Sequence, residues 1–170
     1  MGVQIPALRG FPLDEEQLAV LGEIAALSAL VEAVLDGIIC RLVTEDRDAI
    51  SPLVAGQPFG WLLRALKELL PRAGEYSKEL STWSATLKQP MEERNRLIHS
   101  IWLLRLDQLP GATLGKRPRR WGNNEAHFES AERMAVVRDE LAAAYQIGLK
   151  IAHGMTASTT EDIPVRLTES

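Results

Sequence analysis

The chain has very little cysteine: Cys40 is the single cysteine among 170 residues. Without a second thiol no disulfide can form within the chain, and a reducing compartment such as the cytoplasm is expected. Because Cys40 lies in an apolar helical run, we interpret it as a buried structural thiol. The first 13 residues contain no basic segment followed by an apolar one, and Pro6 stands where a myristoylation signal needs Ser or Thr. Neither export nor lipidation is expected.

The sequence also lacks an uninterrupted apolar segment and a nucleotide-binding motif. Its longest apolar region, residues 18–43, contains four charged side chains that would be costly in a lipid bilayer. These are Glu23, Glu32, Asp36 and Arg41. A water-soluble helix without membrane association is therefore predicted. No glycine-rich phosphate loop and no strand–turn–helix unit is present, so a Rossmann or P-loop site has no support.

The few histidines do not form a metal-binding pattern. The spacing of His99, His127 and His153 matches no zinc motif, and Cys40 is remote in sequence. Ser100 does not lie in the strand-to-helix turn that exposes a hydrolase nucleophile. We therefore expect no metal and no other cofactor.

Helical periodicity is the main signal that is present. Hydrophobic residues make up 46% of the chain and charged residues 25%, as in an ordinary soluble domain. Apolar residues recur at spacings of three and four. They predict helices over residues 14–43, 59–70, 75–87, 91–106 and 129–153. Pro90 either begins the fourth of these helices or kinks a continuing one. We predict an all-α fold, a helical bundle of four main helices plus a shorter one.

A single folded domain is expected from the chain length. The predicted organisation is an N-terminal arm (1–13), one helical-bundle domain (14–153) and a mobile C-terminal tail (154–170). Residues 107–127 contain three glycines and two prolines and show little periodicity. They predict a long loop, which could hold a short hairpin, before the last helix.

The segment MEERNRLIHSIW (91–102) places dense polar chemistry on a helix that otherwise looks buried. At 100° per residue, four of its polar side chains share one face, and apolar residues occupy the opposite, core-facing side. The polar face comprises Glu92, Asn95, Arg96 and His99. Arg94 lies about 140° from His99, among the apolar residues. Because an unpaired buried charge is costly, Arg94 needs a partner or a route to solvent.

The plainest interpretation of this polar face is structural. Glu92 and Arg96 have the i,i+4 spacing of an ion pair worth about 0.3 kcal/mol, and His99 would be a surface residue. This interpretation leaves Arg94 unexplained.

The hexapeptide RNRLIH (94–99) resembles the Arg-polar-x3-His signature, R-N-x-x-x-H, of the HEPN superfamily of small helical-bundle domains. In that family the signature lies on a late helix, before a variable connection and a final helix, and it has the same place here. The resemblance covers the helical layout of residues 14–153 and rests on this one motif. It implies a bundle of four to five helices and, in many members, metal-independent RNA cleavage at a homodimer interface.

Carried over to this chain, the resemblance implies His99 as the general base and Arg94 as the cation that stabilises phosphate charge. Asn95 would orient the substrate or the histidine. Arg96 is a supporting residue, and Glu92 a partner of Arg96 or of His99. Since Arg94 and His99 are far apart around the helix, three options stay open: Arg94 reaches round, Arg96 is the catalytic cation, or a second subunit completes the site. The third option fits the family's dimeric site and predicts an inactive monomer.

A basic segment follows the motif. The whole chain carries a net charge of −4, but residues 88–120 contain eight basic and three acidic side chains, a local charge of +5. Such a field favours a phosphate backbone, and an aromatic side chain in it could stack on an unpaired base. The candidate RNA-binding residues are Lys116, Arg117, Arg119, Arg120 and Trp121. A solvated basic loop with a tucked tryptophan explains the same residues equally well.

Two functions of different classes follow. The first is an endoribonuclease of HEPN type, which the resemblance links to toxins or effectors of bacterial toxin–antitoxin and phage-defence systems. Its partners would be RNA, a second copy of the chain and a cognate antitoxin protein. The second is a non-catalytic helical module that binds a nucleotide, RNA or a protein, with the motif helix mainly holding a dimer together.

Overall fold

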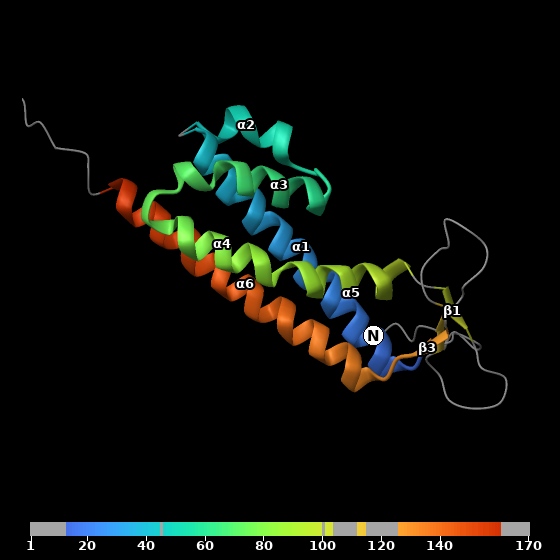
Figure 1. The fold of residues 1–170 in the computed structure, drawn as a ribbon. Helices are drawn as coiled ribbons and strands as arrows, with labels where there is room; N and C mark the ends of the chain where they lie inside the picture. The colour runs from blue at the N-terminus through green and yellow to red at the C-terminus, as the bar shows by residue number, and fades with distance from the viewer. Residues whose placement is uncertain (1–12, 45, 100, 104–111, 115–125, 161–170) are drawn as a thin grey trace, which may run out of the picture.

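In a computed structural model the chain forms an all-α helical bundle (Figure 1). The structure describes residues 13–44, 46–99, 101–103, 112–114 and 126–160. In chain order the elements are α1 (Glu15–Val43), α2 (Arg47–Val54), α3 (Phe59–Leu69), the 3₁₀ turns η1 (Leu70–Arg72) and η2 (Gly74–Tyr76), α4 (Ser77–Thr86), α5 (Lys88–His99), β1 (Ile101–Leu103), β2 (Ala112–Leu114), β3 (Ala126–Phe128) and α6 (Ala131–Thr160). The predicted fold class is confirmed.

The two long helices, α1 and α6, lie side by side and run in the same direction (Figure 1). Near their starts, Nε2 of Gln17 donates a hydrogen bond to the carbonyl oxygen of Glu129 at 2.9 Å. Near their ends, Nη1 of Arg41 donates to the carbonyl oxygen of Ala152. These two contacts fix the register of the pair along its length.

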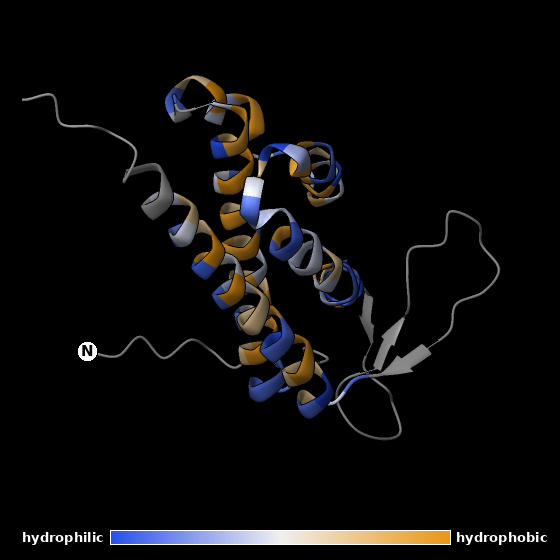
Figure 2. Ribbon diagram, turned by 60° about the vertical axis from the view of Figure 1, so that its left-hand side comes forward, coloured by the Kyte–Doolittle hydropathy of each residue, from blue (hydrophilic) through white to orange (hydrophobic). Residues whose placement is uncertain are grey.

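Helix α1 begins at a capping box and supplies the centre of the core. The carboxylate of Asp14 accepts a hydrogen bond from the backbone N–H of Gln17, and the Gln17 side chain accepts one from the backbone N–H of Asp14. By length and composition alone α1 could span a membrane, since an 18-residue window has a mean hydropathy of 2.0. Apolar residues follow most of its length (Figure 2), and Ile24, Val31 and Leu35 are fully buried inside the bundle. Core packing thus gives part of this apolar character a structural role, since 28% of that window is buried.

Between α1 and α6, one helix was not predicted and another ends earlier than predicted. Helix α2 was not predicted, because Ser51-Pro52 is typical of a helix end; the Asp46 carboxylate caps α2 by accepting from the N–H of Ala49 at 3.2 Å. The helix predicted to reach residue 106 ends at His99 instead. Strand β1 follows, in a run whose β-branched and aromatic residues favour extended backbone.

A small antiparallel sheet joins α5 to α6. Its strand order is β1-β2-β3, with Trp102 opposite Thr113 and Thr113 opposite His127. The predicted loop at 107–127 therefore contains β2 and the start of β3, while β1 lies in the segment that was predicted to be helical.

Helix α6 continues past its predicted end at residue 153. Gly154 does not stop it, because its φ is not positive and the backbone does not make the left-handed turn by which a glycine ends many helices. This glycine lies against Tyr76: a Cβ built on it would be 3.0 Å from the tyrosine hydroxyl oxygen. The helix ends at Thr160, and the rest of the predicted tail lies outside the described residues.

A close approach between Trp83 and Gly148 brings α4 against both long helices. Trp83 is 2% exposed, and its indole N–H donates to the carbonyl oxygen of Ala144 at 2.7 Å. A Cβ on Gly148 would lie 2.4 Å from Cζ2 of Trp83 and 2.9 Å from Cγ1 of Val34. The missing side chain at 148 therefore allows α1, α4 and α6 to meet.

We expect Gly148→Ala to lower the free energy of unfolding by about 1–3 kcal/mol, because the buried indole ring has no room to move away from the added methyl group. Urea unfolding would measure the change. Gly22→Ala is the matched control, since Gly22 is also helical but has no atom within 4 Å of the added Cβ. That control should gain about 0.5–1 kcal/mol from helix propensity. Equal effects of the two substitutions would contradict the packing argument.

Candidate functional site

Helix α5 carries the motif and begins as a new helix. One residue, Leu87, separates it from α4, and the Leu87 carbonyl oxygen accepts a hydrogen bond from the N–H of Met91 at 3.2 Å. Pro90 is the third residue of α5, in the first turn, where its missing N–H has no partner to lose. Of the two options for Pro90, the structure thus has the helix start. Met91 and Leu97 are buried and set the rotation of α5 about its axis.

Arg94 leaves the core side of α5 toward α1. Its Nε donates to Oγ of Ser28 at 3.0 Å, and its Nη1 donates to Oδ1 of Asn95 at 2.8 Å. Ser28 is fully buried and donates its own hydroxyl proton to the Ala25 carbonyl oxygen at 2.8 Å, so its oxygen can accept from Arg94. The predicted need of Arg94 for a partner is met by two neutral groups. Among the described residues, no carboxylate forms an ion pair with this guanidinium.

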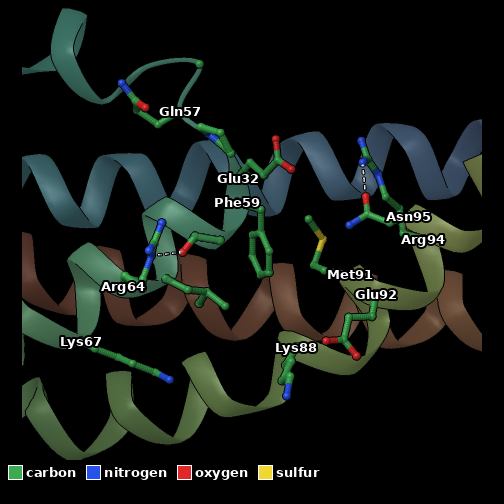
Figure 3. Close-up of a pocket in the computed structure, with 14 residues that line it drawn as sticks. Glu32, Gln57, Phe59, Arg64, Lys67, Lys88, Met91, Glu92, Arg94 and Asn95 are labelled. Carbon is green, nitrogen blue, oxygen red and sulfur yellow. Dashed lines mark hydrogen bonds between the residues drawn. The ribbon is translucent and has the colours of Figure 1, made fainter. Parts of the chain in front are cut away.

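Arg94 and Asn95 line an open cleft between α3 and α5, of about 760 Å³ (Figure 3). Glu92 lines it as well. His99 is exposed at the last position of α5 and is not among the residues that line the cleft. One chain therefore brings Arg94 and Asn95 together and leaves His99 apart. The separation of Arg94 from His99 agrees with the helical wheel, whereas the wheel had placed Asn95 and His99 on one face.

Three further cations line the cleft: Arg64, Lys67 and Lys88. Lys88 belongs to the basic segment 88–120 noted in the sequence, whereas Arg64 and Lys67 were missed. Arg64 and Lys67 could not be linked to the motif from the sequence, because they belong to α3, which is remote from the motif along the chain. The i,i+3 spacing of Arg64 and Lys67 was a usable signal, since it places both side chains on one helix face. Nothing in the sequence places that face opposite α5.

Arg96 forms ion pairs with two carboxylates. Its guanidinium lies 2.7 Å from Oε2 of Glu93 and 2.5 Å from Oε1 of Glu129, and Glu129 is only 3% exposed. Burial lowers the pKa of Arg96, but the hydrogen bonds and negative charges of Glu129 and Glu93 outweigh it, so the net shift of the pKa is upward. The predicted i,i+4 pair with Glu92 is wrong, because Arg96 turns toward α6 while Glu92 faces the cleft.

The structure does not test the predicted basic loop. The candidate RNA-binding residues Lys116, Arg117, Arg119, Arg120 and Trp121 lie outside the described residues. Within the part of the chain that is described, no three His, Cys, Asp or Glu side chains are grouped closely enough to hold a metal ion.

Comparison of the chain with protein-family models, with curated proteins and with solved structures finds no match. The residues of the site and the resemblance of the motif are therefore the only indications of a function.

We expect Glu129→Gln to lower the free energy of unfolding by about 1–3 kcal/mol, because it removes a charged hydrogen bond in a buried setting. Glu93→Gln is the matched control on the same arginine. Since the Glu93 side chain is 39% exposed, its loss should cost less than about 1 kcal/mol. Urea unfolding of both variants tests the difference, and an equal loss would show that the buried pair has no special weight.

Proposed function

We propose that this chain is a metal-independent endoribonuclease of HEPN type that acts as a homodimer. The observation that carries the proposal is the state of Arg94: a half-buried guanidinium, held by neutral partners, at the edge of an open cleft. Its positive charge is available to an anion. An exposed histidine, His99, ends the same helix.

The proposed reaction uses the 2′-hydroxyl of RNA as the nucleophile. His99 takes the proton from this hydroxyl, the 2′-oxygen attacks the adjacent phosphorus, and the bond to the 5′-oxygen of the next nucleotide breaks. Products are a 2′,3′-cyclic phosphate and a 5′-hydroxyl, whose proton comes from the histidine or from water. Arg94 stabilises the charge on the phosphate during transfer, for which a planar and permanently charged guanidinium is suited. Asn95, hydrogen bonded to Arg94, holds the guanidinium and orients the substrate.

A second protomer would complete this site. Arg94 faces the cleft and His99 does not, so the two groups of one chain are poorly placed to act on one phosphate. In a two-fold dimer, Arg94 of one protomer and His99 of the partner can face each other, and the symmetry generates two such sites. The resemblance to the HEPN superfamily supports this arrangement.

The biological role that the resemblance supports is that of a cytoplasmic toxin or effector in a toxin–antitoxin or phage-defence system. An antitoxin protein would then be a partner. The RNA-binding role of the basic loop at residues 116–121 belongs to the same proposal.

A non-catalytic binding module is the second candidate, and the contact between Arg94 and Ser28 favours it. A hydrogen bond to a fully buried serine is also what an arginine that only joins α5 to α1 would make. Under this alternative, the motif would hold the bundle together and the cleft would bind without cleaving.

Cleavage of RNA in the presence of EDTA separates the two candidates. We expect the wild-type chain to release products with 2′,3′-cyclic phosphate ends. His99→Ala should lower the rate by about 10²- to 10⁴-fold, since it removes the general base. His153→Ala is the control, because His153 is also exposed but lies on α6. Equal cleavage by wild type and His99→Ala would assign the activity to a contaminant and overturn the proposal.

Mixing two inactive variants tests whether the site is shared between protomers. We expect His99→Ala and Arg94→Ala to be inactive alone, and an equimolar mixture, after subunit exchange, to recover about a quarter of wild-type activity, because half of the dimers are mixed and each has one complete site of two. No recovery, with mixed dimers verified by native mass spectrometry, would place the complete site within one chain.

Ser28→Ala tests the structural role of Arg94 separately. It removes the α1 acceptor but keeps the guanidinium and its contact with Asn95, so we expect a loss of about 1 kcal/mol in unfolding free energy and a smaller loss of RNA cleavage than in Arg94→Ala. Urea unfolding and the EDTA cleavage assay give the two readouts. A binding module would lose stability in the same way and show no cleavage in any variant.

A further inference from the structure

The cleft between α3 and α5 gathers more positive charge than the motif supplies. Four cations and two carboxylates line it, a net charge of +2. The cations are Arg64, Lys67, Lys88 and Arg94, and the carboxylates are Glu32 and Glu92. This excess occurs in a chain whose net charge is −4, so the cleft is locally opposite in sign to the whole molecule.

The three cations outside the motif are exposed and free of carboxylate partners. Within the described residues, no ion pair involves Arg64, Lys67 or Lys88. Nε of Arg64 donates to the Gly60 carbonyl oxygen at 3.3 Å, and this bond leaves the two terminal nitrogens of the guanidinium to other acceptors. By contrast, Arg96 and Arg138 are each paired with two carboxylates. The charges of the three cleft cations are therefore available to an anionic ligand.

Both helices present one continuous face to the cleft. The lining residues of α3 after its first are Gly60, Leu63, Arg64 and Lys67, and those of α5 include Lys88, Met91, Glu92 and Asn95. Each set has the i, i+3, i+4, i+7 spacing of a single helix face. The cleft thus has two walls, each about 10 Å long, which is enough for a stretch of extended polymer.

An apolar centre lies between Arg64 and Lys67 at one end of the cleft and Arg94 at the other. Phe59 is partly buried and Met91 is buried, and both line the cleft. Figure 3 places Phe59 and Met91 between Arg64 and Lys67 on one side and the Arg94–Asn95 pair on the other. An aromatic ring flanked by cations matches a base with phosphates on both sides.

We propose that this cleft binds single-stranded RNA, with Arg64, Lys67 and Lys88 on backbone phosphates and Phe59 stacked on one base. The choice of RNA rests on the proposed ribonuclease function. The strand would run along α3 and reach Arg94 at the end of the cleft, so the three cations position the RNA for the catalytic cation.

A binding assay with an RNA that cannot be cleaved tests this site independently of catalysis. We would titrate the full chain into a fluorescein-labelled 12-nucleotide 2′-O-methyl RNA and follow fluorescence anisotropy at several salt concentrations. The test variant carries Arg64→Ala, Lys67→Ala and Lys88→Ala. Its matched control carries Arg72→Ala, Lys78→Ala and Lys150→Ala, which remove three exposed cations outside the cleft and give the same net charge.

We expect the test variant to bind at least about tenfold more weakly than the control at 0.1 M salt. The slope of log K against log salt should fall by about 2, because each lost phosphate contact on a single strand contributes about 0.7. Circular dichroism melting of both variants verifies that they fold. Equal affinity of the two variants, or no binding by the wild-type chain, would overturn the inference.

Phe59→Leu tests the stacking part and keeps an apolar side chain in place. We expect affinity to fall by about 5- to 100-fold while the salt slope stays at its wild-type value, since stacking involves no ion release. An unchanged affinity would remove Phe59 from the site. If a polyglutamate peptide displaced the RNA at similar charge concentration, the cleft would be a site for acidic polypeptides and the RNA assignment would be wrong.

The EDTA cleavage assay keeps this inference distinct from the proposed function. RNA binding that depends on the three cations, without cleavage by the wild-type chain, supports the cleft and refutes the nuclease. Cleavage that is abolished in His99→Ala but unaffected in the triple cleft variant supports the nuclease and refutes the cleft.

Discussion

The close contact of Trp83 with Gly148 is the constraint on which the arrangement of the helices depends. Because residue 148 has no side chain, the indole ring approaches the backbone of α6, donates to the Ala144 carbonyl oxygen and still packs beside Val34 of α1. A tryptophan is a large apolar group with one polar atom. Here the ring is buried against Gly148, and the indole N–H has its hydrogen-bond acceptor on the same helix, α6. Helix α5 follows α4 after one residue, so whatever fixes α4 also limits where the motif helix can lie.

Polar contacts fix the other end of α5. The Glu129 carboxylate accepts from Arg96, and its backbone carbonyl accepts from Gln17, which in turn forms the capping box of α1. Glu129, two residues before the first residue of α6, thereby joins α1, α5 and α6. With an apolar contact at α4 and a charged one near the C-terminus of α5, the motif helix has little freedom to slide or rotate. This fixed rotation directs Arg94 at Ser28 and Asn95 into the cleft.

Most of the helices could be predicted because their stabilising pattern is local, as in α1, where apolar residues recur at spacings of three and four. The boundaries that were predicted wrongly depend on features outside that pattern: the Asp46 side chain caps α2, and Gly154 keeps a φ that is not positive, so α6 continues past it. For the site, the helical wheel correctly placed Arg94 on the core-facing side of α5, where a charge needs a partner. It did not identify Ser28 as the partner, nor Glu129 as the partner of Arg96, because 66 and 33 residues separate these pairs along the chain. The position of the α3 cations at the cleft could not be predicted for the same reason, since only the tertiary structure places them opposite α5.

The two arginines of the motif differ in what their partners do to their charge. Arg96 has two carboxylates within hydrogen-bonding distance, so its positive charge is already neutralised. Glu93 and Glu129 would also repel an approaching phosphate. Arg94 is held by a hydroxyl and an amide oxygen, which orient the guanidinium without cancelling its charge. Orientation by neutral dipoles is the arrangement that electrostatic catalysis needs, because the full charge remains for the transition state. Of the options that the sequence leaves open, Arg96 as the catalytic cation is therefore the weakest, and its role is to hold α5 against α6.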